Sequence, residues 1–297
     1  MRLRNQHCPS RVRRTKIGAA IFAMQETEQI VLDSSSVIAN GKNLCRINVC
    51  DWNKDGFNDY LIGEIGATIV SDFKLGCVSL LIGKPDGSVD RHVIAEDLAR
   101  TGEAVPFDYD EDGDLDVLVA EFGWNRSGGF RLLRNQTPPN TPADALRFNE
   151  EILDPRHGIL AIQIADMDGD SRMDIVTAYG QEYEMVEILF NRAPGEYEKK
   201  VIARMPDPSY NSSAILVSDL DGDGNLDVKC TYDSVCWWEQ KENLEFVRHS
   251  IERDHCLHAT CTAADVDGDG RIDLVVGELA DKNAKGALRV FWNRQRL

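Results

Sequence analysis

Short runs of apolar residues recur along the chain and are separated by clusters rich in Asp, Asn and Gly. The runs at 117–120 and 274–276, for example, consist mainly of Val and Leu, and each directly follows an Asp-rich cluster. Runs of this length, bounded by turn-forming residues, are typical of β-strands. The pattern therefore predicts an all-β protein.

The clusters between the runs follow one nine-residue pattern, D-x-[DN]-x-D-[GS]-x-x-D, which occurs five times with starts 46 to 58 residues apart. A pattern that returns at such intervals indicates a repeated structural unit. We number the residues of each copy from 1 to 9. The copies are loop 1 (51–59), loop 2 (108–116), loop 3 (166–174), loop 4 (219–227) and loop 5 (265–273).

The side chains in these loops are suited to a hard cation. Oxygen ligands at positions 1, 3, 5 and 9 of a tight loop can converge on Ca²⁺, which takes about six to eight oxygens in a flexible shell. Position 6 is Gly in four copies, where the missing Cβ permits a positive φ. Mg²⁺ prefers a smaller, largely hydrated site, and zinc and copper prefer His and Cys, which none of the loops contains. The sequence therefore predicts calcium as the cofactor.

An EF-hand is the alternative for the start of this pattern. An EF-hand requires a bidentate Glu at position 12 and a helix on each side of the loop. Position 12 is occupied here by Ile62, Val119, Thr177, Cys230 and Val276. The flanking segments are the short apolar runs of strands, so we expect the loops to join strands.

The pattern and the apolar run after it, as in DLDGDGNLDV and DVDGDGRIDLVVG, resemble the FG-GAP or VCBS repeat of integrin-alpha-type β-propellers, over about residues 28 to 297. The resemblance implies blades of four antiparallel strands, with Ca²⁺ in the loop between the first two strands. The ligands that it implies are Asp51, Asn53, Asp55 and Asp59; Asp108, Asp110, Asp112 and Asp116; Asp166, Asp168, Asp170 and Asp174; Asp219, Asp221, Asp223 and Asp227; and Asp265, Asp267, Asp269 and Asp273.

Two copies depart from the family pattern. Asn53 removes one carboxylate from loop 1, and Ser171 stands in loop 3 where the other copies have Gly. Because ligand charge sets calcium affinity and the turn favours Gly, we expect these two loops to be weak or empty sites.

Two further apolar segments follow the loops and complete a four-stranded unit. Third-strand segments are predicted at 78–82, 130–134, 186–190, 235–238 and 288–292, and fourth-strand segments at 91–94, 148–152, 197–202 and 246–251. The last unit therefore lacks its fourth strand, and residues 28–32 have the pattern of the missing one. We expect five four-stranded blades in one domain, 28–297, closed by this N-terminal strand, which leaves no long sheet edge exposed. An open or truncated arc is the alternative.

The face opposite the loops offers candidate binding residues. Five residues beyond each position 9 stand Glu64, Glu121, Tyr179, Tyr232 and Glu278, which pseudo-rotation would place in one annulus. Neighbouring segments add Trp124, His157, Tyr210, His255 and His258. Carboxylates and aromatic rings around a shallow central pocket suit a carbohydrate or protein partner, such as a sugar, an amine or a basic peptide. Ordinary solvent-exposed strand ends without a binding role are the alternative. The primary hypothesis is therefore a non-enzymatic recognition or adhesion module.

A polysaccharide-active enzyme, a glycosidase or lyase working on that opposite face, is the alternative function. Paired carboxylates can hydrolyse glycosides. The sequence contains no dedicated acid and base outside the repeated positions, no nucleophile elbow and no phosphate loop. No catalytic residue is therefore assigned, and the prediction favours a protein that is not an enzyme.

The net charge of the chain disfavours one class of partner. With 33 Lys and Arg against 50 Asp and Glu, the net charge is −17, which disfavours binding to nucleic acid. The loops hold 21 of those acidic residues, so much of the excess is local and calcium would neutralise part of it. No apolar run reaches the roughly 18 residues of a transmembrane segment.

The N-terminal residues have some features of an export signal. Residues 1–27 form a basic leader in which the first 25 residues carry six Lys and Arg and no acid, and the basic residues all precede a short apolar stretch at 17–24. This arrangement resembles a signal peptide of minimal length, and a leader without signal function is the alternative. Together with the family resemblance it predicts a secreted, periplasmic or cell-surface protein.

The eight cysteines do not form an obvious disulfide framework. Cys45 and Cys50 fall within one predicted strand, about 16 Å apart and beyond the reach of a disulfide. Cys230 and Cys236 flank a turn and could form a disulfide if their strands pair. The other cysteines are expected to act as small apolar residues on strands.

Overall fold

The computed structural model describes residues 37–138, 141–142, 145–205, 214–231, 235–252, 258–278 and 286–294. These residues form an all-β fold of antiparallel sheets, as predicted. No helix among them is long and apolar enough to cross a membrane. The predicted leader 1–27 and the predicted strand 28–32 lie outside the described residues.

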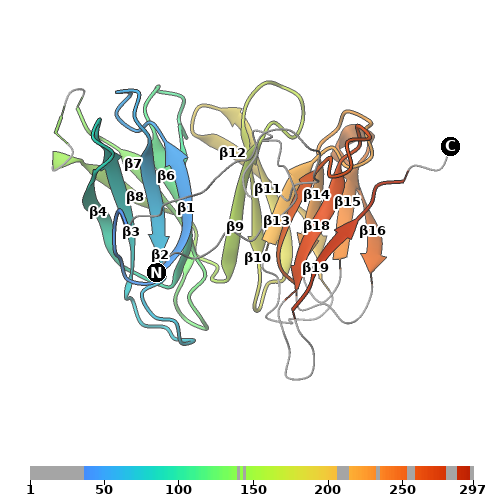
Figure 1. Cartoon of the computed structure of the whole chain (residues 1–297), viewed down its shortest axis with the longest axis horizontal. Coiled ribbons are helices and arrows are strands. Elements are labelled where there is room, and N and C mark those ends of the chain that lie inside the picture. Colours follow the sequence, from blue (N-terminus) through green and yellow to red (C-terminus); the bar gives the residue numbers. More distant parts are fainter. Residues whose placement is uncertain are drawn as a thin grey trace, which may run out of the picture.

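The strands form four sheets of four and one sheet of three, each built from consecutive strands (Figure 1). Sheet 1 contains β1 (Leu44–Cys50), β2 (Asp59–Glu64), β3 (Gly76–Gly83) and β4 (Val89–Leu98). Sheet 2 contains β5 (Thr101–Phe107), β6 (Asp116–Glu121), β7 (Gly129–Asn135) and β8 (Phe148–Asp154). Sheet 3 contains β9 (Ile159–Ala165), β10 (Asp174–Tyr179), β11 (Met185–Ala193) and β12 (Glu196–Arg204).

The remaining two sheets follow the same order. Sheet 4 contains β13 (Ala214–Ser218), β14 (Asp227–Thr231), β15 (Val235–Gln240) and β16 (Phe246–Glu252), with a 3₁₀ turn, η2 (Glu242–Leu244), before β16. Sheet 5 contains β17 (His258–Ala264), β18 (Asp273–Glu278) and β19 (Leu288–Phe291). The predicted third and fourth strands are therefore present in every sheet except that sheet 5 has no fourth strand among the described residues.

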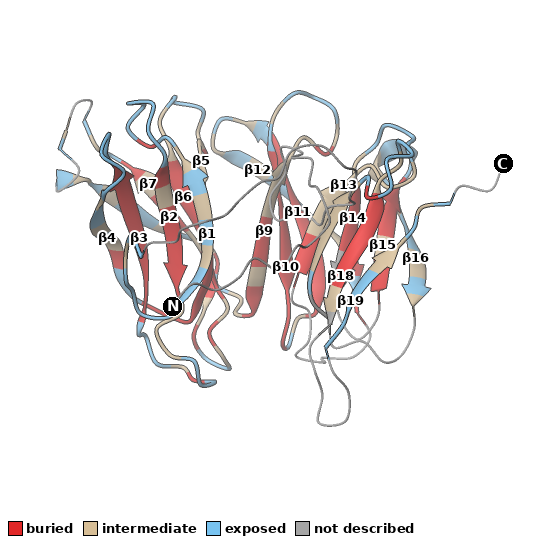
Figure 2. Ribbon diagram, viewed as in Figure 1, coloured by how far each residue is buried: buried red, intermediate tan, exposed pale blue. Residues whose placement is uncertain are grey.

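The five sheets stand side by side, and their first strands contact one another in chain order, β1 with β5, β5 with β9, β9 with β13 and β13 with β17. Neighbouring sheets pack face to face. Val117 and Val119 of β6 belong to the apolar cluster with sheet 1, whereas Leu118 between them belongs to the cluster with sheet 3. Because alternate side chains of a strand point to opposite faces, a strand that is buried on both faces is apolar throughout. Figure 2 shows this burial in the middle strands of each sheet.

The two ends of the array differ from its middle. In β1, Ile47 and Val49 are more than half exposed, whereas every residue of β5 and β9 is buried or half-buried. At the other end, β19 pairs with β18 on one side and has no second partner strand among the described residues. These ends are the surfaces that a closed ring would join.

Cys45, Cys50, Cys77 and Cys261 are free thiols. Cys45 and Cys50 both lie on β1, as predicted. Cys230 and Cys236 are register partners on β14 and β15, but the side chain of Cys230 lies outside the described part of the structure, so the suggested disulfide between them stays a prediction. The sulfur of Cys236 accepts a hydrogen bond from Nη2 of Arg248 at 3.0 Å. Cys77 and Cys236 are buried, as expected for small apolar residues.

Candidate metal centres

All five loops join the first and second strands of their sheets, and position 9 is the first residue of the second strand in each case. The loops consequently lie at the same edge of the array, at the top in Figure 1. The prediction that they connect strands rather than helices is confirmed.

The backbone of every loop has the same two left-handed residues. Position 6 has φ between 72° and 96°, and Ser171 adopts this conformation at 72° without a Gly. Position 4 has φ between 56° and 81°, a feature that the sequence pattern does not reveal because Lys54 and Glu111 occupy it in loops 1 and 2. These two residues turn the chain so that its amide groups point inward, toward the carboxylates.

The carboxylates at positions 1 and 5 hold the turn through backbone hydrogen bonds. The N–H of position 6 donates to Oδ2 of position 1 at 2.9–3.1 Å in all five loops. The N–H of position 7 donates to Oδ1 of position 5 at 2.8–3.0 Å. Each of these Asp residues therefore shapes the backbone of its loop.

The Asp at position 9 is buried in every sheet, with at most 1% of its surface exposed. Its Oδ2 accepts the N–H of position 2 at 2.7–3.0 Å. Its Oδ1 accepts an N–H at the end of the third strand at 2.7–2.9 Å. The side chain thus fastens the loop to the third strand, a structural role that the sequence analysis missed because the strand partner lies 13 to 24 residues further along.

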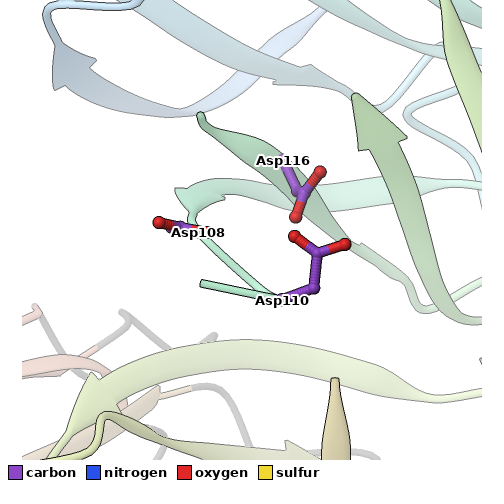
Figure 3. Close-up of side chains that lie close together, drawn as sticks. All are labelled: Asp108, Asp110 and Asp116. Carbon is purple, nitrogen blue, oxygen red and sulfur yellow. The ribbon is translucent and has the colours of Figure 1, made fainter. Parts of the chain in front are cut away.

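Carboxylate oxygens converge inside four of the loops. In loops 2, 3 and 4, one oxygen from each of positions 1, 3 and 9 lies within 4.8 Å of the others, and in loop 5 positions 1, 3 and 5 do so. In loop 2, Asp110 and Asp116 face each other while Asp108 lies across the turn (Figure 3). Loop 1 gives no such triad among the described residues, and the Asn53 amide there donates to Asp55 at 2.8 Å.

Two position-3 residues hold an oxygen atom with no hydrogen-bond partner. Oδ1 of Asp110 and Oδ1 of Asp168 are buried, and neither has a donor among the described residues. Their other oxygens are bound by arginines, Asp110 by Arg134 and Asp168 by Arg192 at 2.5 Å. A buried carboxylate oxygen without a donor is unfavourable unless a cation satisfies it. The donor set of these sites is entirely oxygen, which suits Ca²⁺.

A family model, described as an FG-GAP-like repeat, matches residues 108–177 and 166–229. Residues 108–229 contain FG-GAP-like repeats. Comparison with curated proteins gave no match. The matched residues include loops 2, 3 and 4, and loops 1 and 5 share their backbone conformation and their position-9 hydrogen bonds. The suggested resemblance to FG-GAP repeats is thereby confirmed.

Burial raises the pKa of the position-9 carboxyl groups in three FG-GAP repeats. The pKa values of Asp116, Asp174 and Asp227 are raised to about 6, because burial outweighs the two backbone N–H groups that favour the ionised form. Burial also raises the pKa of Asp108 and Asp114 in loop 2. Without a cation these loops hold their negative charge at a cost in free energy, so a divalent ion and protons compete for them.

The candidate residues on the opposite edge of the FG-GAP repeats are engaged within their own sheets. Glu64 accepts hydrogen bonds from Ser79 and Arg91, both at 2.5 Å, and Glu121 accepts one from Arg131 at 2.7 Å. Both carboxylates are buried. The annulus of binding residues therefore stays a prediction, and its described carboxylates are paired with neighbours.

The other members of that set are less completely described. Tyr179 is buried, and the Arg156 guanidinium lies 4.9 Å from its ring centroid. Nδ1 of His157 lies 3.1 Å from the Gln181 side chain. Tyr232, Tyr210 and His255 lie outside the described residues, as do the side chains of Glu278 and His258.

We expect Asp174→Asn to lower the free energy of unfolding by about 1–3 kcal/mol in metal-depleted buffer. The substitution places an amide N–H₂ against one of two backbone N–H groups that the carboxylate now satisfies. Asp170→Asn is the matched control, because an exposed Asn keeps the oxygen that accepts the N–H of Arg172. Urea unfolding measures both variants. Equal losses would show that position 9 has no special structural role.

We also expect the metal-depleted protein to become less stable as the pH rises from about 4 to 7. A carboxyl group whose folded pKa is raised to about 6 stabilises the fold below its unfolded pKa, and this stabilisation is lost as the pH passes the folded value. Burial alone would raise the pKa of Asp154, but Arg156 and Lys199 lower it to about 2, so its ionisation changes the stability only below about pH 4. The thermal midpoint across this window tests the sign. A midpoint that rises steadily from pH 4 to 7 would contradict it.

Proposed function

We propose that the protein is a calcium-binding β-propeller that acts as a non-enzymatic recognition or adhesion module. The observation that carries the proposal is the pair of buried, partnerless oxygens of Asp110 and Asp168, each inside a cluster of three aspartates. A cation at that place would satisfy the oxygens and neutralise the cluster together.

The ligands in each loop would come from positions 1, 3, 5 and 9, with the carbonyl of position 7 completing the shell. Position 7 is occupied by Phe57, Asp114, Arg172, Asn225 and Arg271, a variety that fits a backbone ligand. When bound, calcium would supply charge neutralisation and rigidity rather than chemistry. Loop 1 remains the weakest candidate, since the amide of Asn53 is directed to Asp55.

Support for a recognition role comes from the opposite edge of the array. The loop between β2 and β3 exposes Ile69, Val70 and Phe73, each by more than half of its surface. The same loop is held in place by Asp72, whose Oδ1 accepts hydrogen bonds from two N–H groups and one hydroxyl of Arg126 and Ser127 at 2.9–3.0 Å. An apolar surface that is fixed in place and exposed is typical of contact with a partner. The partner would be a protein or a carbohydrate, and a secreted, periplasmic or cell-surface location would give it access to calcium.

We also infer that the five sheets close into a ring, with residues 28–32 as the fourth strand of sheet 5. A cavity of about 250 Å³ lies between sheets 4 and 5, and its apolar lining includes Trp237 and Ile251 of sheet 4 and Phe291 of β19. In sheets 1 to 4, a fourth strand pairs with the strand equivalent to β19. A strand added there would cover the cavity and the unpaired edge together.

We expect calcium to raise the thermal midpoint of unfolding, because a ligand that binds only the folded state stabilises it by about 2.7 kcal/mol per site at one hundred times its dissociation constant. The measurement compares calcium, magnesium and a chelator on the full chain. Replacing Asp110 and Asp168 by Asn should reduce the calcium-dependent increase and leave the midpoint in chelator within a few degrees. A thermal midpoint that is the same with calcium and with chelator would contradict the proposal.

Ring closure is tested by replacing Ile30 and Val31 together with Pro, which removes backbone donors from either register of an added strand. We expect the thermal midpoint to fall and the tryptophan fluorescence, to which Trp237 contributes, to shift to longer wavelength. The control replaces Ser10 and Val12 with Pro, outside the predicted strand. If the variant with Pro at 30 and 31 and the control variant both unfold at the same midpoint as the unmodified chain, residues 28–32 do not complete sheet 5.

A further inference from the structure

Position 4 differs between the first two loops and the other three. Lys54 and Glu111 adopt φ values of 59° and 56°, whereas Gly169, Gly222 and Gly268 occupy the same left-handed position in loops 3 to 5. This conformation is unfavourable for residues with a Cβ and costs Gly little. No atom lies within 4 Å of a Cβ built on any of the three glycines, so only the backbone conformation disfavours a side chain there. A residue held in an unfavourable conformation points to a role for its side chain.

Both side chains reach the next loop along the array. Nζ of Lys54 donates a 2.6 Å hydrogen bond to the carbonyl oxygen of Gly113, at position 6 of loop 2. Oε1 of Glu111 accepts from Nη1 of Arg172, at position 7 of loop 3, also at 2.6 Å. The same oxygen accepts from the Asn191 side chain at 3.1 Å. These contacts cross 59 to 80 residues of sequence, and loops 4 and 5 have no side chain at position 4 to make one.

The atoms at the far end of each contact belong to the neighbour's candidate metal centre. The N–H of Gly113 donates to Oδ2 of Asp108, and Gly113 precedes the residue whose carbonyl would bind the ion. The N–H of Asn191 donates to Oδ1 of Asp174, the position-9 carboxylate of loop 3. Ordering one loop around an ion would therefore also restrict the backbone of the next.

We propose that Lys54 and Glu111 are positioning residues that couple calcium binding in loops 1, 2 and 3, so that an ion in one loop favours binding in its neighbour. This inference rests on the proposed calcium binding. A loop that is already restrained loses less conformational entropy when it binds its own ion, which produces positive cooperativity. Loops 4 and 5, with Gly at position 4, bind independently of this chain of contacts.

Charge alone predicts a different pattern, which makes the two explanations separable. Lys54 places a positive charge beside loop 2 and Glu111 a negative charge beside loop 3, so their removal changes calcium affinity in opposite directions by electrostatics. If the two side chains act by linking neighbouring loops, removing either one lowers the cooperativity of calcium binding. High salt weakens the electrostatic change in affinity but does not restore the lost cooperativity.

The test is a calorimetric calcium titration of the full chain and of Lys54→Gly, Glu111→Gly and the double variant. Gly is the natural residue at position 4 of the other loops, so we expect the variants to fold and their metal-depleted stability to be equal or greater. The unmodified chain should show a Hill coefficient above 1, and the double variant one close to 1 for the same sites. Asn243→Gly, another left-handed residue at φ 60°, is the control and should keep the original value.

A second test removes the contact between Glu111 and Arg172 by changing the arginine. Arg172→Asn introduces the residue found at position 7 of loop 4 and removes the contact with Glu111. It should lower cooperativity as much as Glu111→Gly, and the two changes combined should lower it no further. Equal cooperativity in the unmodified and all substituted chains would overturn the coupling and leave calcium binding intact. No calcium binding by the unmodified chain would overturn the proposed function and this inference together.

Discussion

The Asp at position 9 of each loop joins the candidate metal centre to the sheet beneath it. Both of its oxygens accept backbone N–H groups, one from its own loop and one from the end of the third strand. The same carboxylate lies within reach of the centre of loops 2, 3 and 4. Because the group is buried, any change in its charge or contacts affects the strands and the loop together.

This arrangement separates two tasks along the same strands. The middle of each sheet is buried on both faces and forms the apolar clusters between sheets 1 and 2, 2 and 3, and 3 and 4. The ends of the strands carry polar groups, with carboxylates of the loops at one edge and pairs such as Glu121 and Arg131 at the other. Apolar packing gives the array its rigidity, and the edges remain available for ions and partners.

The parts of the structure that depend on neighbouring residues were predictable from the sequence. The loop pattern, the strand that follows it and the third and fourth strands all come from local alternation and turn residues, and the structure has them in those places. The described residues of loop 1 form no carboxylate triad, and the expectation that Asn53 weakens this site stays a prediction. Ser171, in contrast, keeps the left-handed turn and the triad of loop 3.

The features that the sequence did not reveal depend on residues far apart in the chain. The strand partner of each position-9 Asp, the arginines on Asp110 and Asp168, and the contacts of Lys54 and Glu111 are set by how sheets and loops pack together. The ion pair between the buried Glu64 and Arg91 is a further case, since spacing alone suggested that Glu64 is an open binding residue. The sequence pattern of the loops identifies which residues can bind a cation. The packing of sheets and loops determines which of their oxygen atoms have no hydrogen-bond partner and can bind one.

Anomalous scattering from crystals of the full chain grown with calcium tests the account most directly. We expect anomalous peaks among the carboxylates of loops 2, 3 and 4, beside Oδ1 of Asp110 and Oδ1 of Asp168 in the first two, and a weaker peak or none in loop 1. Ordered water or an arginine in place of a peak in those three loops, at calcium levels typical of the extracellular space, would contradict it.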